Sequence, residues 1–247
     1  TESESNFSLK IGAGVAEKSN QKLDSLSVID EEEVNELIEK AVKSAKSTNE
    51  DGELIAQVVK VTSDELANKV VDEVSKTSTD DKKDLSAKVL KAIVDTEPSK
   101  IDSLDKEIKD KVIEQVIESA KDQQESLDEG QSLSNEEDFT DVVADIVTKT
   151  DNDTVEKVFE TLNEVSETTE SKLSLSFVEN LSKKDNYEEK IEILSATSNV
   201  IEKSIDKIIE NAVEDVSSEN DLDKIKNLIE NSKGTLSNKI IDAASKN

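Results

Sequence analysis

The sequence lacks most of the side chains on which catalytic and metal-binding sites depend. It contains no cysteine, histidine, methionine or tryptophan, and all 31 basic residues are lysine. Without cysteine and histidine the chain has no disulfides, no thiolate or imidazole metal ligands, and none of the common serine or cysteine nucleophile arrangements. We therefore expect a non-enzymatic protein with no catalytic residues, no cofactor and no specific metal site.

The absence of arginine and the excess of acidic residues bear on the partners. Arginine is the side chain that binds phosphate in a bidentate manner, and the formal net charge of the chain is −28. Such a surface repels a phosphate backbone unless lysines are strongly clustered, and the sequence shows no basic stripe. We expect no nucleic-acid partner, and only nonspecific screening of the negative charge by divalent cations or salt.

Long apolar runs are also missing. No run approaches the roughly 20 residues of a membrane-spanning helix, and residues 1–27 contain no signal-peptide core. We therefore expect no membrane insertion. The chain begins at Thr1 without methionine, so we expect a processed protein or a segment of a longer one. This favours a virion, extracellular or cell-surface location over the cytoplasm.

What is present is a periodic pattern of leucine, isoleucine and valine. Hydrophobic residues make up only 33% of the chain, but they recur at helical spacing, and one proline and five glycines leave long stretches without a helix breaker. The pattern predicts an all-α protein of some ten or eleven helices. Asp30 is expected to cap the first helix, and Pro98 to end a helix that carries Ile93 and Val94.

Two long stretches, residues 55–121 and 143–209, repeat one apolar pattern at an offset of about 88 residues, the separation of Val70 from Val158. The offset persists through the intervening loops, which favours a duplicated helical unit over a set of unrelated amphipathic helices. The paired positions include Ala56 and Ala144, Thr62 and Thr150, Leu85 and Leu173, Val112 and Val200, and Ile117 and Ile205.

A weaker repeat appears at about half that spacing, where Leu66 and Val70 align with Ile108 and Val112. A helix pair every 40 to 47 residues or so resembles the architecture of HEAT and armadillo repeats, in which each pair buries its apolar faces against its neighbours. The resemblance is to an architecture and not to a specific family. It implies tandem helical hairpins that form an α-solenoid or an irregular helical bundle.

The composition divides the chain into five expected segments. They are an irregular N-terminal arm (1–29), a first helical unit with its entry helix (30–121), a polar linker or loop (122–136), a second helical unit (137–216) and a C-terminal helical hairpin cap (217–247). The linker reads equally as a flexible hinge or as a long surface loop. The hairpin is expected to turn at Gly234, a residue suited to left-handed backbone.

Three apolar residues in the N-terminal arm form the one candidate binding element. Phe7, Leu9 and Ile11 alternate with polar residues, so the arm is either a disordered leader or a docking arm that adds to a neighbouring subunit. Elsewhere, the clusters at 151–153 and 219–221 resemble parts of calcium-binding loops, but they lack the glycine and the twelfth-position glutamate. Helix capping explains both clusters.

The repetition, the missing catalytic residues and the missing initiator predict a structural or assembly protein, such as a virion or cell-surface component. It would act through protein partners or self-assembly. The alternative is an acidic adaptor whose helical surface binds a basic partner protein. An enzyme would require a pocket with two or more buried carboxylates.

Overall fold

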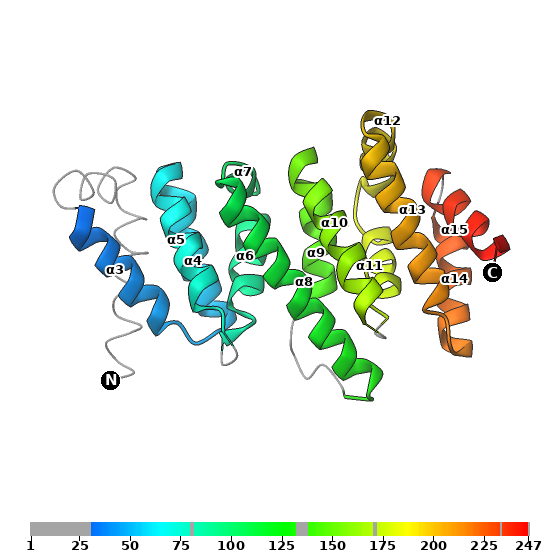
Figure 1. Cartoon of the computed structure of the whole chain (residues 1–247), viewed down its shortest axis with the longest axis horizontal. Helices are drawn as coiled ribbons and strands as arrows, with labels where there is room; N and C mark the ends of the chain where they lie inside the picture. The colour runs from blue at the N-terminus through cyan, green and yellow to red at the C-terminus, as the bar shows by residue number, and fades with distance from the viewer. Residues whose placement is uncertain (1–30, 80–81, 132–137, 170–171, 233, 247) are drawn as a thin grey trace. The chain divides into compact units, whose positions relative to one another are not determined.

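The computed structural model describes residues 31–79, 82–131, 138–169, 172–232 and 234–246. Within these ranges the chain forms thirteen α-helices and no strand, which confirms the predicted all-α class (Figure 1). In chain order the helices are α3 (Glu31–Ser44), α4 (Asn49–Val61), α5 (Asp64–Thr77), α6 (Leu85–Thr96), α7 (Ser99–Asp102), α8 (Lys106–Asp128), α9 (Phe139–Lys149), α10 (Asn152–Thr168), α11 (Leu173–Ser182), α12 (Tyr187–Thr197), α13 (Asn199–Glu214), α14 (Glu219–Asn231) and α15 (Gly234–Lys246).

The helices outnumber the ten or eleven expected, in part because one predicted helix is divided. The apolar spacing of Ile101, Leu104 and Ile108 predicts a single helix, but Ile101 lies in the short helix α7, and α8 begins after Asp105. The side chain of Asn68 accepts a hydrogen bond from the Asp105 backbone N–H at 2.7 Å. This bond takes the place of the helical hydrogen bond that the Asp105 N–H does not make. Ile101 and Leu104 are buried all the same.

The chain separates into two compact units, residues 1–116 and 117–247, and the division falls inside α8. The sequence had suggested a polar linker at 122–136, whereas α8 continues to Asp128. The polar side chains there make tertiary hydrogen bonds. Gln124 is buried and accepts a hydrogen bond from Ser176 at 2.6 Å, and Gln123 accepts one from the Phe139 backbone N–H at 2.8 Å. Residues 132–137 lie outside the described ranges.

In the first unit, alternate helices pack against one another. α3 contacts α5, and α4 contacts α6, an arrangement that lets each helix bury one apolar stripe. Gln115 of α8 links α5 to α6, because its side chain donates to the Ser75 carbonyl at 2.8 Å and accepts from the Ser86 hydroxyl at 2.7 Å. The fully buried side chains of this unit include Ile55, Val71, Val74, Leu85, Leu90, Ile93 and Ile113.

Helices α4 and α6 approach each other closely at Gly52. A Cβ atom built on Gly52 would lie 2.9 Å from both the carbonyl carbon and the carbonyl oxygen of Lys88. The two helices can cross at this distance only because glycine has no side chain. In the second unit the residue 88 positions later is Thr140, which is 2% exposed and accepts a hydrogen bond from Asn180 at 2.6 Å.

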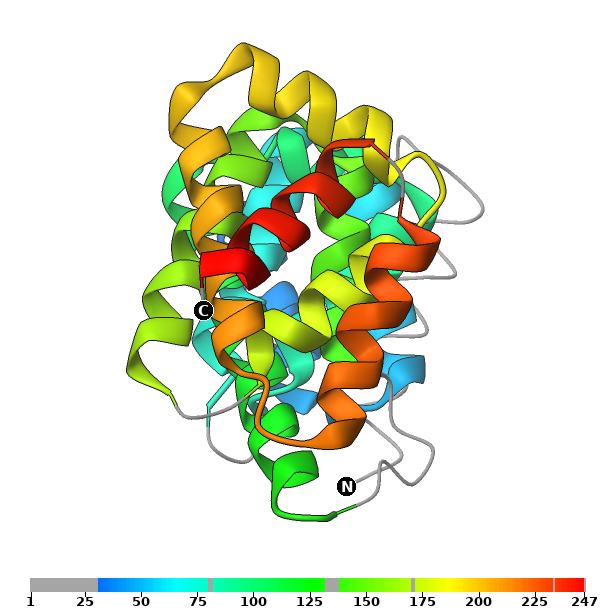
Figure 2. The ribbon, with the colours of Figure 1, turned by 90° about the vertical axis from the view of Figure 1, so that its right-hand side faces the viewer.

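In the second unit, α11 contacts α9 and α13, α13 contacts α10 and α15, and α14 pairs with α15. Figure 2 looks onto this terminal hairpin, coloured orange to red, with α13 beside it. The predicted turn glycine, Gly234, has a φ of +63° and begins α15. Phe159 and Phe177 meet edge to face in the core, with ring centroids 6.2 Å apart.

Several hydrogen bonds occur in both units at the predicted offset. Ser78 and Ser86 are joined at 2.8 Å, as are Ser166 and Ser174. The hydroxyls of Thr62 and Thr150 both bond to the last turn of the helix that precedes them. A duplicated helical unit would give such pairs, although duplication itself stays a prediction.

The correspondence fails at one of the predicted pairs. Val112 is fully buried, whereas Val200 is 59% exposed. Val200 lies in the first turn of α13, which is a separate helix from α12, while Val112 lies well inside α8. The neighbouring pair, Ile117 and Ile205, is buried in both units.

Candidate functional site

The described part of the chain offers no metal centre and no membrane span. No group of three or more acidic, histidine or cysteine side chains there is placed to hold a metal ion, and none of the described helices is long and apolar enough to cross a bilayer. Phe7, Leu9 and Ile11, the candidate docking arm, lie outside the described residues.

The two acidic clusters that resemble calcium loops act as helix caps. Asp151 caps α10 by accepting the Thr154 backbone N–H at 2.9 Å. Ser218 and Asp221 form a reciprocal capping box at the start of α14. Both arrangements satisfy backbone donors that the helices leave free at their first turns.

The surface grooves of the described residues are lined by paired charges. One groove, of about 310 Å³, lies between α13 and α15, where Lys239 pairs with Asp206 and Lys246 pairs with Asp242. A second lies between α3 and α5, where Lys43 pairs with Glu39. Most of the lysines are paired with carboxylates, and Lys82 of the second groove donates to the Lys43 backbone carbonyl, so neither groove presents a concentrated charge to a ligand.

The most highly connected polar cluster surrounds Lys172, the residue that precedes α11. The Lys172 ammonium binds Asp221 of α14 at 2.6 Å, and its backbone N–H donates to Asp128 of α8 at 3.0 Å. With Asp215, at the end of α13, these residues form what we term the Lys172 junction. The junction connects four helices within the second unit.

Asp221 is the well-satisfied carboxylate of the junction. Its side chain is only 3% exposed, and it accepts hydrogen bonds from the Ser218 hydroxyl at 2.7 Å and the Ser218 N–H at 3.1 Å as well as from Lys172. Burial alone would raise the pKa of Asp221, but the hydrogen bonds from Lys172 and Ser218 lower it to about 2. Asp221 therefore stays ionised down to strongly acidic pH.

Asp215 is the poorly satisfied carboxylate of the junction. The backbone N–H of Leu175, in the first turn of α11, favours its ionised form, whereas its Oδ2 atom is buried without a hydrogen-bond partner among the described residues. Burial raises the pKa of Asp215 to about 6, and the negative charges of Asp128 and Glu214 reinforce this rise. The Leu175 N–H opposes it.

Sequence reasoning did not single out the Lys172 junction. Lys172 and Asp215 lie in polar stretches that resemble the rest of this highly charged chain, and nothing local to them signals a tertiary contact. One clue was available. Lys172 is the residue before α11, and a lysine side chain carries no acceptor atom that could cap that helix. A helix that begins this way leaves its first backbone N–H groups open to a carboxylate from elsewhere, and the Leu175 N–H acts on Asp215.

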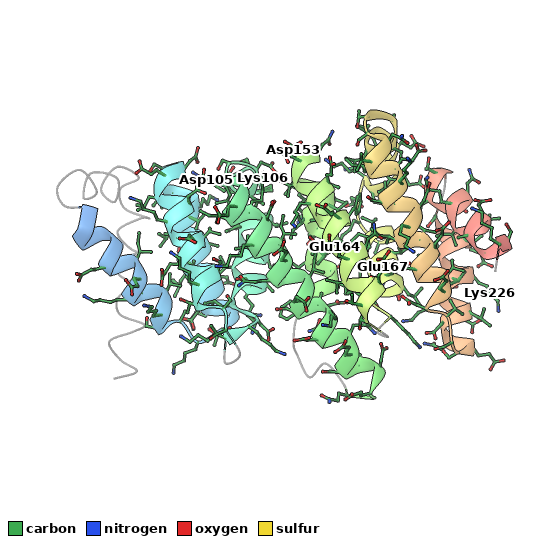
Figure 3. The ribbon with its side chains drawn as sticks, in the orientation of Figure 1. Asp105, Lys106, Asp153, Glu164, Glu167 and Lys226 are labelled. Carbon is green, nitrogen blue, oxygen red and sulfur yellow. The ribbon has the colours of Figure 1, made fainter. Side chains whose placement is uncertain are left out.

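A second surface feature is the outward face of α10. Carboxylates recur along it every three or four residues, which places them on one side of the helix, and Figure 3 labels three of them, Asp153, Glu164 and Glu167. We term this set the α10 acidic face; it consists of Asp153, Glu156, Glu160, Glu164 and Glu167. The helix contains a single lysine, Lys157.

The corresponding helix of the first unit, α5, is better balanced. Its carboxylates pair with lysines: Glu65 with Lys69 at 3.6 Å, and Asp72 with Lys76 at 2.5 Å. On the α10 acidic face, Glu167 pairs with Lys207 at 3.7 Å, and that lysine comes from α13. The α10 acidic face is therefore a concentration of negative charge on one helix.

Large exposed apolar side chains form the third feature. The four most exposed among the described residues all belong to the second unit, where they lie on α12 to α15: Ile193, Val200, Leu222 and Ile241. Each is about half exposed. Leu222 and Ile241 lie on the paired helices of the terminal hairpin (Figure 2).

Comparison with known proteins adds no function, because no protein-family description matches the chain and no curated protein is similar to it in sequence.

Proposed function

We propose that the chain is a non-enzymatic assembly protein that acts through its surface, such as a component of a virion or a cell-surface layer. The observation that carries the proposal is the concentration of exposed apolar side chains on α12 to α15. Exposed large apolar side chains that gather in one patch mark interaction sites, and in a chain with only 33% hydrophobic residues these four are the candidates for such a contact. The terminal hairpin, with Leu222 and Ile241, is the proposed contact.

Light scattering coupled to gel filtration tests this proposal at about 0.05 M and about 0.5 M salt. Self-association should increase with salt, because screening weakens the mutual repulsion of chains that carry a charge of −28. The double variant Leu222→Ser with Ile241→Ser should reduce it. Asn227→Ser with Ala244→Ser, at exposed uncharged positions of the same two helices, is the matched control. A protein that stays monomeric throughout contradicts the assembly proposal.

A second candidate function is supported by the α10 acidic face. Helix α10 carries several carboxylates and a single lysine. Its negative surface is therefore complementary in charge to a basic partner protein. In this alternative the chain is an adaptor, and the partner contributes the lysines or arginines that α10 lacks.

Binding of a lysine-rich peptide, followed by fluorescence anisotropy, separates this alternative from general attraction to a negative protein. Glu160→Gln with Glu164→Gln should weaken binding by about tenfold at low salt. The control, Glu65→Gln with Glu73→Gln on α5, removes the same charge from a helix with more lysines. Equal loss of affinity in both variants would show that only net charge matters and would refute a site on α10.

A further inference from the structure

Asp215 is held in an arrangement that suits a protonated carboxyl better than a carboxylate. The Leu175 N–H, in the first turn of α11, favours the ionised carboxylate, but Oδ2 is buried with no donor among the described residues. A buried carboxylate oxygen without a hydrogen bond is costly. A proton on that oxygen removes the buried negative charge, which is the costlier of the two states.

The charges that surround Asp215 act in the same direction. Asp128 at the end of α8 and the neighbouring Glu214 raise the pKa of Asp215 by their negative charge, and the positive charge of Lys172 lowers it. The Lys172 ammonium is already bound to Asp221, at 2.6 Å. Asp215 therefore competes for a cation that another carboxylate holds.

We propose that the Lys172 junction is a proton-sensitive latch that fastens the α14–α15 hairpin to α11, tighter when Asp215 is protonated and looser when it is ionised. The geometry supports this because Lys172 forms an ion pair from the start of α11 to α14, and Asp215 lies at the end of the helix that leads into α14. A second ion pair joins the same two helices further along, between Glu179 of α11 and Lys224 of α14 at 3.4 Å. The proposal does not depend on the assembly function.

The direction of the pH effect follows from proton linkage. The pKa of Asp215 is raised from 3.8 to about 6, so the closed latch binds a proton that the open one releases. Closure is therefore favoured below about pH 4, and the advantage is lost as the pH rises through about 6. Asp221 does not oppose this change, because its lowered pKa of about 2 keeps it ionised and bound to Lys172.

The size of the effect is limited by the pKa shift. Each pKa unit corresponds to a tenfold change in the closing equilibrium, which gives an upper bound of roughly 100-fold for the shift of Asp215. Asp215 is only partly buried, so solvent screening reduces the effect. We expect about a tenfold change in latch opening between about pH 5 and about pH 7.5.

Amide hydrogen exchange of the full chain measures the latch directly. Protection factors for α14 and α15, corrected for the intrinsic pH dependence of exchange, should be about tenfold higher at about pH 5 than at about pH 7.5. Asp215→Asn, a neutral side chain of the same shape, should abolish this difference and raise protection at neutral pH. Glu230→Gln removes one exposed charge from α14 and is the control, which should behave like the wild-type chain.

A pH difference that persists in Asp215→Asn, or that Glu230→Gln also abolishes, refutes the latch, because global charge would then explain the effect. A carboxyl NMR titration of the unmodified chain is independent of how the variants fold. A midpoint near 6 for Asp215 supports the proposal, whereas a midpoint at the ordinary value of about 4 overturns it.

Discussion

Replacing Gly52 with alanine tests how closely α4 and α6 approach. A Cβ atom at this position would lie 2.9 Å from the backbone carbon and oxygen of Lys88, and backbone atoms inside a helix cannot rotate away as a side chain can. The helices would have to move apart by several tenths of an ångström and lose contacts in their shared core. Overpacking of this kind costs about 1–3 kcal/mol.

An opposing effect makes the sign of the result informative. Alanine favours the helical state over glycine by about 1 kcal/mol. If the close approach exists, the free energy of unfolding should still fall, by up to about 2 kcal/mol after that gain is subtracted. If the approach is looser, Gly52→Ala should instead stabilise the protein.

Urea unfolding followed by far-ultraviolet circular dichroism measures this difference. Glu53→Ala, at the adjacent exposed position of α4, is the control for a helix-surface change and should shift stability by less than about 0.5 kcal/mol. A Gly52→Ala variant that is as stable as the wild type, or more stable, refutes the reasoning.

Three further changes should alter the free energy of unfolding by amounts that the contacts predict. Lys190→Met removes the ammonium that donates to the Thr150 carbonyl at 2.7 Å and should lower the unfolding free energy, measured with urea, by about 1.5–2 kcal/mol. The control, Lys203→Met, replaces an exposed lysine on α13 and should change the unfolding free energy little. Phe177→Ala removes a side chain that is 1% exposed and packs edge to face against Phe159, and should lower the unfolding free energy by about 3–5 kcal/mol. Lys172→Met leaves the Asp221 carboxylate buried without its cation and should cost about 2–3 kcal/mol, with calorimetry as the measurement.

Each of these predictions has a contrary result. Equal stability of the Lys190→Met and Lys203→Met variants would show that the bond to Thr150 adds nothing beyond a surface charge. A loss below about 1 kcal/mol for Phe177→Ala would mean that the core readily collapses around the cavity. A Lys172→Met variant that gains stability would show that the buried ion pair costs more than it contributes.

The sequence predicted the fold where the signal was local and repeated. The stripes that contain Val70, Val71 and Val74 required a helix with one buried face, and these residues are buried on α5. Pro98 correctly marked the end of α6, because a helix rarely continues into proline. Gly234 adopts the left-handed backbone that its residue type suggested.

The sequence failed where a distant residue decides the local structure. The break before α8 is stabilised by Asn68, which lies 37 positions earlier and accepts the Asp105 N–H. The polar residues at 122–128 continue a helix because partners such as Ser176 and Phe139 bind their side chains. No periodicity of the chain can reveal such partners, and for the same reason Asp215 gave no signal of its own.

The lysines that bind backbone carbonyls have a consequence for chemical labelling. Lys100 donates to the Thr62 carbonyl at 2.8 Å, and Lys190 donates to the Thr150 carbonyl, each at the C-terminal end of a helix. Acetylation or reaction with an amine-directed cross-linker would remove the charge that holds these carbonyls. Lys100 and Lys190 should therefore react later than exposed amines such as Lys203 and Lys226, and their modification should be accompanied by fraying of α4 and α9.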